Sequence, residues 1–206
     1  MPHSTRDKIL IAAATMLGED PTARLSVRAV AARAGVSTGS LRHFFPTQRE
    51  LIDAVVEGLQ TLDLPEDPMR DTSRSPAERL EACLQLLLSG AGTGEKARQN
   101  WTALHEAYVA STVPEDAVHV FSALERLSVD QVERWLVVLR DEGVLAPGDL
   151  EQHARFLLTV VNGLSLERAL PGAHSRIGFE AHTLRTAAAA VLQHGIGARS
   201  ATGERS

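Results

Sequence analysis

The sequence has few of the features that mark secreted, zinc-binding or membrane proteins. Cys83 is the only cysteine among 206 residues, which excludes an internal disulfide and a zinc site built from several cysteines. Its apolar neighbours predict a small core residue. No apolar run approaches the roughly 20 residues that a membrane-spanning helix needs, and the N-terminal segment lacks the features of a signal peptide. We therefore expect a cytoplasmic protein.

Signatures of catalysis are also scarce. The glycine-rich run 90–96, GAGTGEK, lacks the ending of a phosphate-binding loop and is expected to be a flexible connection. The histidines of the later part of the chain form no H-E-x-x-H or similar ligand pair; they stand at positions 105, 119, 153, 174, 182 and 194. The sequence therefore predicts no catalytic residue, no metal site and no cofactor.

Acidic residues are missing from one segment, 21–49. It holds five arginines and no Asp or Glu, although the formal net charge of the whole chain is -5. The first 60 residues hold seven Lys or Arg against six Asp or Glu, whereas residues 61–206 hold fourteen against twenty. This local excess predicts a polyanionic partner, because Lys and Arg on one face are the electrostatic mark of nucleic-acid binding.

Helical periodicity dominates, and no strand pattern of convincing length appears, so we predict an all-α fold. Ser4 with Asp7, and then Ser26, predict the starts of the first two helices. Gly35 supplies a tight turn because it has no Cβ. A third helix is expected at about 37–44 and a fourth after Thr47. This is the order of a helix-turn-helix domain.

The faces of the third helix are expected to differ. Its apolar residues Leu41, Phe44 and Phe45 should pack onto the first two helices. The polar residues between them should then face outward.

The C-terminal part reads as a helical bundle. A proline-containing boundary at 63–75 separates it from the N-terminal domain. Helices are expected at about 75–89, 95–111, 115–142, 149–170 and 178–194, which gives about nine in the chain. We thus predict a DNA-binding domain at 1–62, a second helical domain at 63–195, and a disordered tail at 196–206.

The segment 36–51, VSTGSLRHFFPTQREL, closely resembles the signature of the tetracycline-repressor (TetR) family. The preceding VRAVAARAG is similar to that family's second helix, and the resemblance covers roughly residues 5–60. It implies a helix-turn-helix domain followed by a ligand-binding, dimerising bundle. Thr38, Arg42 and Gln48 depart from the residues that many relatives have, so base and phosphate contacts cannot be copied from those relatives.

The candidate DNA contacts lie on and around the third helix: Arg28, Ser37, Thr38, Gly39, Ser40, Arg42, His43, Thr47 and Gln48. Thr38 and Ser40 either contact DNA or cap the helix. Arg42 either forks onto a guanine or pairs with a phosphate. His43 is a candidate through the family resemblance. Arg28, and Thr47 with Gln48, are expected at phosphates.

The resemblance also implies a ligand pocket and a dimer face. A pocket is usually apolar with few polar groups, and the candidates are Trp101, His105, Tyr108, Phe121, Phe156 and Asn162. The first three share one helical face. Apolar stripes on the last two helices suit a dimer face, with the alternative that they form intrachain core: Leu157, Val161, Leu164, Leu184, Ala188 and Leu192.

These observations predict a homodimeric, ligand-responsive transcriptional regulator. By family resemblance it is a repressor that binds a palindromic double-stranded operator and is released by a small apolar or amphipathic molecule. Two recognition helices would enter successive major grooves about 34 Å apart. The alternatives are an all-helical enzyme or a scaffold without DNA binding, and neither explains an acid-free, arginine-bearing helix-turn-helix.

Overall fold

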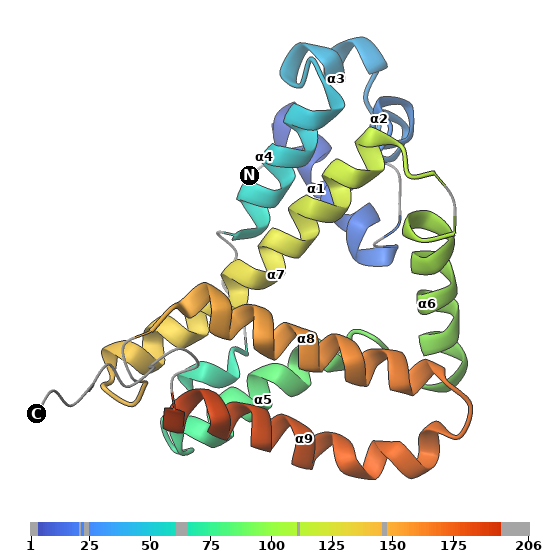
Figure 1. The fold of residues 1–206 in the computed structure, drawn as a ribbon. Helices are drawn as coiled ribbons and strands as arrows, with labels where there is room; N and C mark the ends of the chain where they lie inside the picture. Colours follow the sequence, from blue (N-terminus) through green and yellow to red (C-terminus); the bar gives the residue numbers. More distant parts are fainter. Residues whose placement is uncertain are drawn as a thin grey trace, which may run out of the picture. The chain divides into compact units, whose positions relative to one another are not determined.

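A computed structural model describes residues 4–20, 22, 25–60, 66–110, 112–145 and 148–194, apart from the side chains of residues 116, 173–175 and 194. Within these residues the protein is all-helical, with nine α-helices, one 3-10 helix and no strand (Figure 1). The α-helices are α1 (Thr5–Glu19), α2 (Val27–Ala34), α3 (Thr38–Phe44), α4 (Gln48–Gln60), α5 (Pro76–Ser89), α6 (Gly94–Tyr108), α7 (Glu115–Asp141), α8 (Leu150–Ala169) and α9 (Ala173–His194). The predicted tail, 196–206, lies outside the described residues.

The chain divides into two compact units. The first contains Met1–Asp63 and Thr102–Leu127, and the second contains Leu64–Trp101 and Ser128–Ser206. α7 is one continuous helix whose first half belongs to the first unit and whose second half belongs to the second. The N-terminal helices therefore share a unit with a segment that lies far along the sequence.

Local sequence signals set the helix ends in the first unit. Ser4 and Asp7 form the expected capping box, and the Ser26 hydroxyl accepts a hydrogen bond from the backbone N–H of Ala29. Gly35 ends α2 in the left-handed conformation, with φ 66°, where a side chain would be strained. The 3-10 helix Pro68–Arg70, η1, was not expected from the sequence.

The first unit has its own hydrophobic core. Helices α1 to α4 and the first half of α7 contribute buried side chains that include Ile9, Val30, Leu41, Leu51 and Val120. Phe45 is buried as expected, but the expectation for Phe44 was wrong, since its side chain is 38% exposed. Phe44 ends α3 and stands edge-on against His43, with 5.2 Å between the ring centroids.

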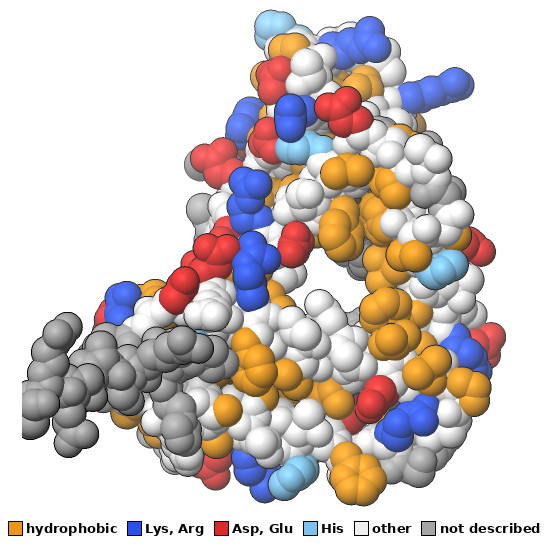
Figure 2. Space-filling view, viewed as in Figure 1, with side chains coloured by type: hydrophobic (Ala, Val, Ile, Leu, Met, Phe, Trp, Pro, Cys, Tyr) orange, Lys and Arg blue, Asp and Glu red, His pale blue; other side chains and the backbone are white. Residues whose placement is uncertain are grey.

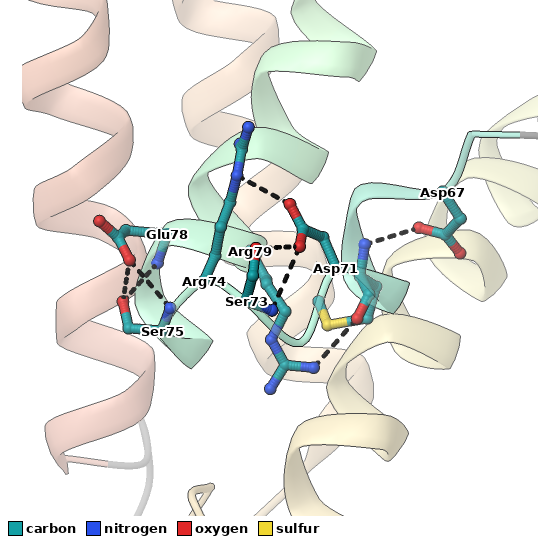
Figure 3. A network of polar contacts seen from close by, with 8 residues as sticks. Asp67, Asp71, Ser73, Arg74, Ser75, Glu78 and Arg79 are labelled. Atoms are coloured by element: carbon teal, nitrogen blue, oxygen red, sulfur yellow. Dashed lines mark hydrogen bonds and ion pairs between the residues drawn. The ribbon is translucent and has the colours of Figure 1, made fainter.

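In the second unit, α5, α8 and α9 pack against one another. Trp135 of α7 is buried in this core, and its indole N–H donates to the Asp67 carboxylate over 3.0 Å. Asp67 also accepts from the backbone of Met69 and so caps η1. Arg79 donates to the Met69 carbonyl oxygen over 3.0 Å and pairs with Glu142. This polar network holds the segment before α5 against α5 and α7. Figure 3 shows the part of the network around Asp67 and Arg79.

The apolar stripes predicted as a dimer face lie inside the second unit instead. Leu157, Leu184 and Ala188 are fully buried in the core of a single chain, Val161 and Leu164 are nearly so, and Leu192 packs against them. A residue already covered by its own chain cannot offer much surface to a second copy. The alternative interpretation of these stripes, as intrachain core, therefore describes them better.

α9 begins five residues before the expected position 178. Gly172, with φ 77°, makes the turn after α8, and α9 starts directly after it. None of the helices in the described part of the chain combines the length and the hydropathy needed to span a bilayer.

Candidate nucleic-acid interface

The candidate interface is the pair α2 and α3 with the turn between them. After Gly35, the backbone N–H of Val36 donates to the Ala31 carbonyl oxygen over 3.0 Å and closes the turn. Leu41 is fully buried and fixes one face of α3 to the core. Because residues three or four positions apart share one face of a helix, burial of Leu41 leaves the polar residues of α3 facing outward.

The outward face of α3 is polar and accessible. Thr38, Gly39, Arg42 and His43 are exposed, and Ser40 is half-buried. This arrangement brings together five of the predicted DNA contacts on seven residues of helix. Figure 2 shows Lys, Arg and His side chains at the top of the view, the end at which Figure 1 draws α3.

The cap of α3 is Ser37. Its hydroxyl accepts a hydrogen bond from the backbone N–H of Ser40 over 3.0 Å. The side-chain hydroxyls of Thr38 and Ser40 make no hydrogen bond within the described part of the chain. Ser37, and not Thr38 or Ser40, therefore caps α3. The hydroxyls of Thr38 and Ser40 are available to a ligand.

The arginines of this region differ in their surroundings. Arg33 forms an ion pair with Glu19 of α1. Arg28 and Arg42 are exposed, and neither has an ion-pair partner among the described residues. A free guanidinium retains all five N–H donors for phosphate or guanine, so Arg28 and Arg42 are the stronger candidates.

The helix-turn-helix region matches a known family of DNA-binding regulators, and the chain as a whole resembles members of that family. The family model described as "Bacterial regulatory proteins, tetR family" matches residues 9–55, from α1 to α4. The HTH-type transcriptional repressor KstR2 of Mycolicibacterium smegmatis is 29% identical over 144 residues, which are 69% of this chain and 66% of that protein. The aligned region is thus just under two thirds of the length of that relative.

Residues 9–55 thus belong to the TetR family of bacterial regulatory proteins. This segment contains the helices α1 to α4, so the candidate DNA contacts lie in a domain that is typical of bacterial regulatory proteins. A transcriptional regulator from Rhodococcus sp. Rha1 shares the fold of this chain, with a TM-score of 0.56, 23% identity, and coverage of 92% of this chain and 97% of that one. The structure described as "SmeT-Triclosan complex" is 26% identical, with a TM-score of 0.51 and 99% of both chains covered.

The turn between α2 and α3 also matches the sequence pattern of a catalytic motif. Residues 35–39, GVSTG, match the G-x-S-x-G pattern of hydrolases. In a nucleophile elbow that pattern joins a strand to a helix, whereas here it joins two helices and Ser37 caps the second. Residues 35–39 therefore form the turn of a helix-turn-helix and do not have the geometry of a nucleophile elbow.

Thr47 and Gln48 begin α4. The Thr47 hydroxyl accepts from the backbone N–H of Glu50 over 3.1 Å and donates to the Glu50 carboxylate over 2.8 Å. Gln48 is half-buried and lines a groove between α4 and the first half of α7. Thr47 therefore has a capping role, and its phosphate contact stays a prediction.

Arg6 of α1 escaped the sequence analysis. Its guanidinium lies 5.5 Å from the centre of the Phe45 ring, directly after α3. A cation over an aromatic face is held in place at little cost in solvation. Arg6 is exposed and joins the residues around α3 as a further positive charge. Nothing in the local sequence links residue 6 to residue 45, so only the packing of α1 on α3 reveals it.

The predicted ligand residues are distributed over both units. Tyr108 and Phe121 meet in the first unit, with ring centroids 4.9 Å apart, and burial raises the pKa of the Tyr108 hydroxyl. His105, also of the first unit, is exposed.

Three further ligand candidates belong to the second unit. Trp101 donates to the Ser165 hydroxyl over 3.1 Å. Phe156 is half-buried against the core, and Asn162 is exposed. The helical face expected to join Trp101, His105 and Tyr108 thus runs across the division between the units, and a role in ligand binding stays a prediction for all six residues.

Proposed function

We propose that this TetR-family regulator is a homodimeric repressor that binds a palindromic operator and is released by a small molecule. The observation that carries the proposal is the outward face of α3, on which the side chains of Thr38, Ser40 and Arg42 have no hydrogen-bond or ion-pair partner among the described residues. Hydroxyls and guanidinium groups of this kind contact base edges and phosphates in the major groove. In the cell the protein would act in the cytoplasm.

The functional division would follow the sequence. Residues 1–62 would bind DNA, and 63–195 would bind the effector and the second copy. Within that second part, residues 102–127 pack in the unit that carries the DNA-binding helices. This segment is therefore in direct contact with the helices of the proposed DNA-binding domain.

Dimerisation is proposed on geometric grounds. α3 has seven residues and reaches few base pairs, whereas a two-fold pair reads both halves of a palindrome. Since the stripes first considered are intrachain core, the dimer face should use the apolar residues that remain exposed where α8 ends and α9 begins. These are Leu166, Leu170, Ile177 and Phe179.

A small-molecule effector is proposed from two observations. The solved structure at 26% identity is a complex with triclosan. In this chain, Phe121 is 45% exposed and packs beside half-buried Tyr108, which offers aromatic surface with one hydroxyl. An effector that lowers DNA affinity by some factor must lose affinity for the DNA-bound protein by the same factor.

Selection of DNA from a random-sequence pool tests the proposal. Purified protein should enrich fragments that contain an inverted repeat, and light scattering should show two copies of the chain per duplex. Binding should weaken steeply as salt rises, because arginines that contact phosphates release counterions. A protein that enriches no sequence at low salt would be a scaffold or another kind of helical protein, and the proposal would fail.

A further inference from the structure

A hydrogen bond between two side chains joins α4 to α7. The Nε2 atom of His119 lies 2.9 Å from the Oδ1 atom of Asp53. The His119 side chain is 21% exposed and the Asp53 side chain 59% exposed. Both residues belong to the first unit, and Figure 1 shows α4 alongside the first half of α7.

The pair stands beside an apolar contact between the same helices. Val120 and Ala123 of α7 are buried in the core that also holds Ile52 and Val56 of α4. His119 lies at the edge of this contact, in a groove whose other charged residues are Arg49, Glu57, Glu115 and Arg126. The apolar contact is non-directional, whereas a hydrogen bond of defined geometry adds a directional constraint on the register of the two helices.

The two helices have particular positions in the chain. α4 begins at Gln48, four residues after α3 ends at Phe44, so a tilt of α4 moves α3. α7 continues without a break into the second unit. The Asp53–His119 pair therefore joins α4, which follows the candidate DNA-binding helix α3, to α7, which continues into the second unit.

We propose that the Asp53–His119 pair is a latch that holds α3 in its DNA-binding arrangement, and that loosening it lowers DNA affinity. The proposal rests on the DNA-binding function proposed above. The two residues are positioning residues, since they act on DNA through α4 and α3. A shift of α7 would be transmitted through this contact to α4 and from there to α3.

The loss of charge and the loss of the contact change DNA affinity in opposite directions. Asp53→Asn removes a negative charge from a domain that binds a polyanion, so electrostatics alone would strengthen DNA binding. The latch requires the opposite result, because the amide loses the charge-assisted bond to His119. Glu57 stands one helical turn further along α4, in the same groove, and has no ion pair among the described residues. Glu57→Gln is thus the matched control for charge.

The experiment compares Asp53→Asn, His119→Ala and the double variant with wild type, and uses Glu57→Gln and Ser122→Ala as controls. The probe is a DNA duplex that the wild-type protein selects from a random pool. Fluorescence anisotropy gives the dissociation constant at several salt concentrations, and thermal unfolding reports on folding. If His119→Ala fails to fold, Asp53→Asn decides the question.

Each single variant should bind DNA about two- to five-fold more weakly, the range expected from a partly exposed ion pair. The double variant should be no weaker than the weaker single variant, since both changes break one contact. The salt slope should equal that of wild type, because no phosphate contact is removed. The controls should bind as tightly as wild type, or slightly more tightly for Glu57→Gln.

The latch is overturned if Asp53→Asn binds like Glu57→Gln, or if the losses of the two single variants multiply in the double variant. A changed salt slope would also overturn it, since that would place His119 or Asp53 in the DNA contact itself. A wild-type protein that selects no DNA would instead refute the proposed function. The two failures are therefore distinguishable.

Discussion

A Cβ atom built on Gly39 would meet the hydroxyl oxygen of Ser37 at 3.8 Å. That distance is ordinary van der Waals contact, so the protein itself has room for an alanine at this position. Gly39 is helical and exposed, and its backbone needs no left-handed conformation. The absence of a side chain at Gly39 therefore allows a partner such as DNA to approach the backbone of α3 closely.

Gly39→Ala should separate folding from DNA binding. Alanine in place of a helical glycine should raise the free energy of unfolding by up to about 1 kcal/mol. The added methyl group should hold α3 away from the groove floor and weaken DNA binding by about ten-fold, equivalent to about 1.4 kcal/mol. Thermal unfolding and fluorescence anisotropy measure the two effects. A more stable variant with unchanged affinity would show that DNA does not approach Gly39.

Cys83 should be inert in the folded protein. Burial is the main cause that raises the pKa of its thiol from 9.0 to about 12, and the nearby Asp67 carboxylate adds to it. The reactive thiolate is then nearly absent at pH 8. Iodoacetamide should modify Cys83 much more slowly in native protein than in urea, as followed by mass spectrometry. Equal rates would contradict the buried, neutral thiol.

The same pKa gives a dependence of stability on pH. In the unfolded chain the thiol has its ordinary pKa of 9.0, and in the folded chain about 12. Above pH 9 the unfolded state loses the proton first, so the free energy of unfolding should fall as pH rises toward 12. Cys83→Ala should lack this component, which urea titrations between pH 8 and pH 11 can detect.

Local signals in the sequence predicted much of the fold. The capping pair Ser4 with Asp7 marks the start of α1 as expected, and Ser75 with Glu78 caps α5 where a helix start was expected. Such signals are local, because a cap involves residues three apart. Gly35 marks the turn for a similarly local reason. The start of α9 was predicted at 178, five residues too late, and Gly178 lies within the helix. A glycine inside a helix costs only about 1 kcal/mol, so its presence does not end one.

Properties that depend on tertiary packing were harder to predict. An apolar stripe such as Leu157 and Leu184 has the same spacing whether it faces its own chain or a second copy. Phe44 follows the periodicity of a core residue, but it ends a short helix and points away. The approach of His119 to Asp53 joins residues 66 positions apart, and no local pattern encodes such a contact.

An effector should bind near the aromatic pair of the first unit. Small aromatic compounds, with triclosan as the first probe, should raise the midpoint of thermal unfolding, because a ligand of the native state stabilises it. Tyr108→Ala should abolish this shift and the effect of the compound on DNA binding, with DNA affinity itself preserved. Val138→Ala, at an exposed position of the second unit, is the control. An undiminished shift in Tyr108→Ala would exclude Tyr108 from the site.

The dimer should depend on the exposed residues of α8 and α9. Phe179 is 68% exposed and Leu166 40% exposed. Phe179→Asp or Leu166→Asp would place a charge in an apolar interface and should give a monomer in sedimentation analysis, with much weaker operator binding. Val138→Asp changes an equally exposed residue of α7 and should leave the dimer intact. Dimers of unchanged stability in both α8 and α9 variants would place the interface elsewhere.

The central claim is that α3 reads DNA, and the most direct test compares Arg42→Ala with Arg33→Ala. Both changes remove one positive charge, but Arg42 has no ion-pair partner in the described part of the chain, whereas Arg33 pairs with Glu19. Anisotropy on the selected duplex should show that Arg42→Ala loses about 1–3 kcal/mol of binding free energy, with Arg33→Ala much less affected and both variants folded. Equal affinity of Arg42→Ala and wild type for that duplex would contradict the account.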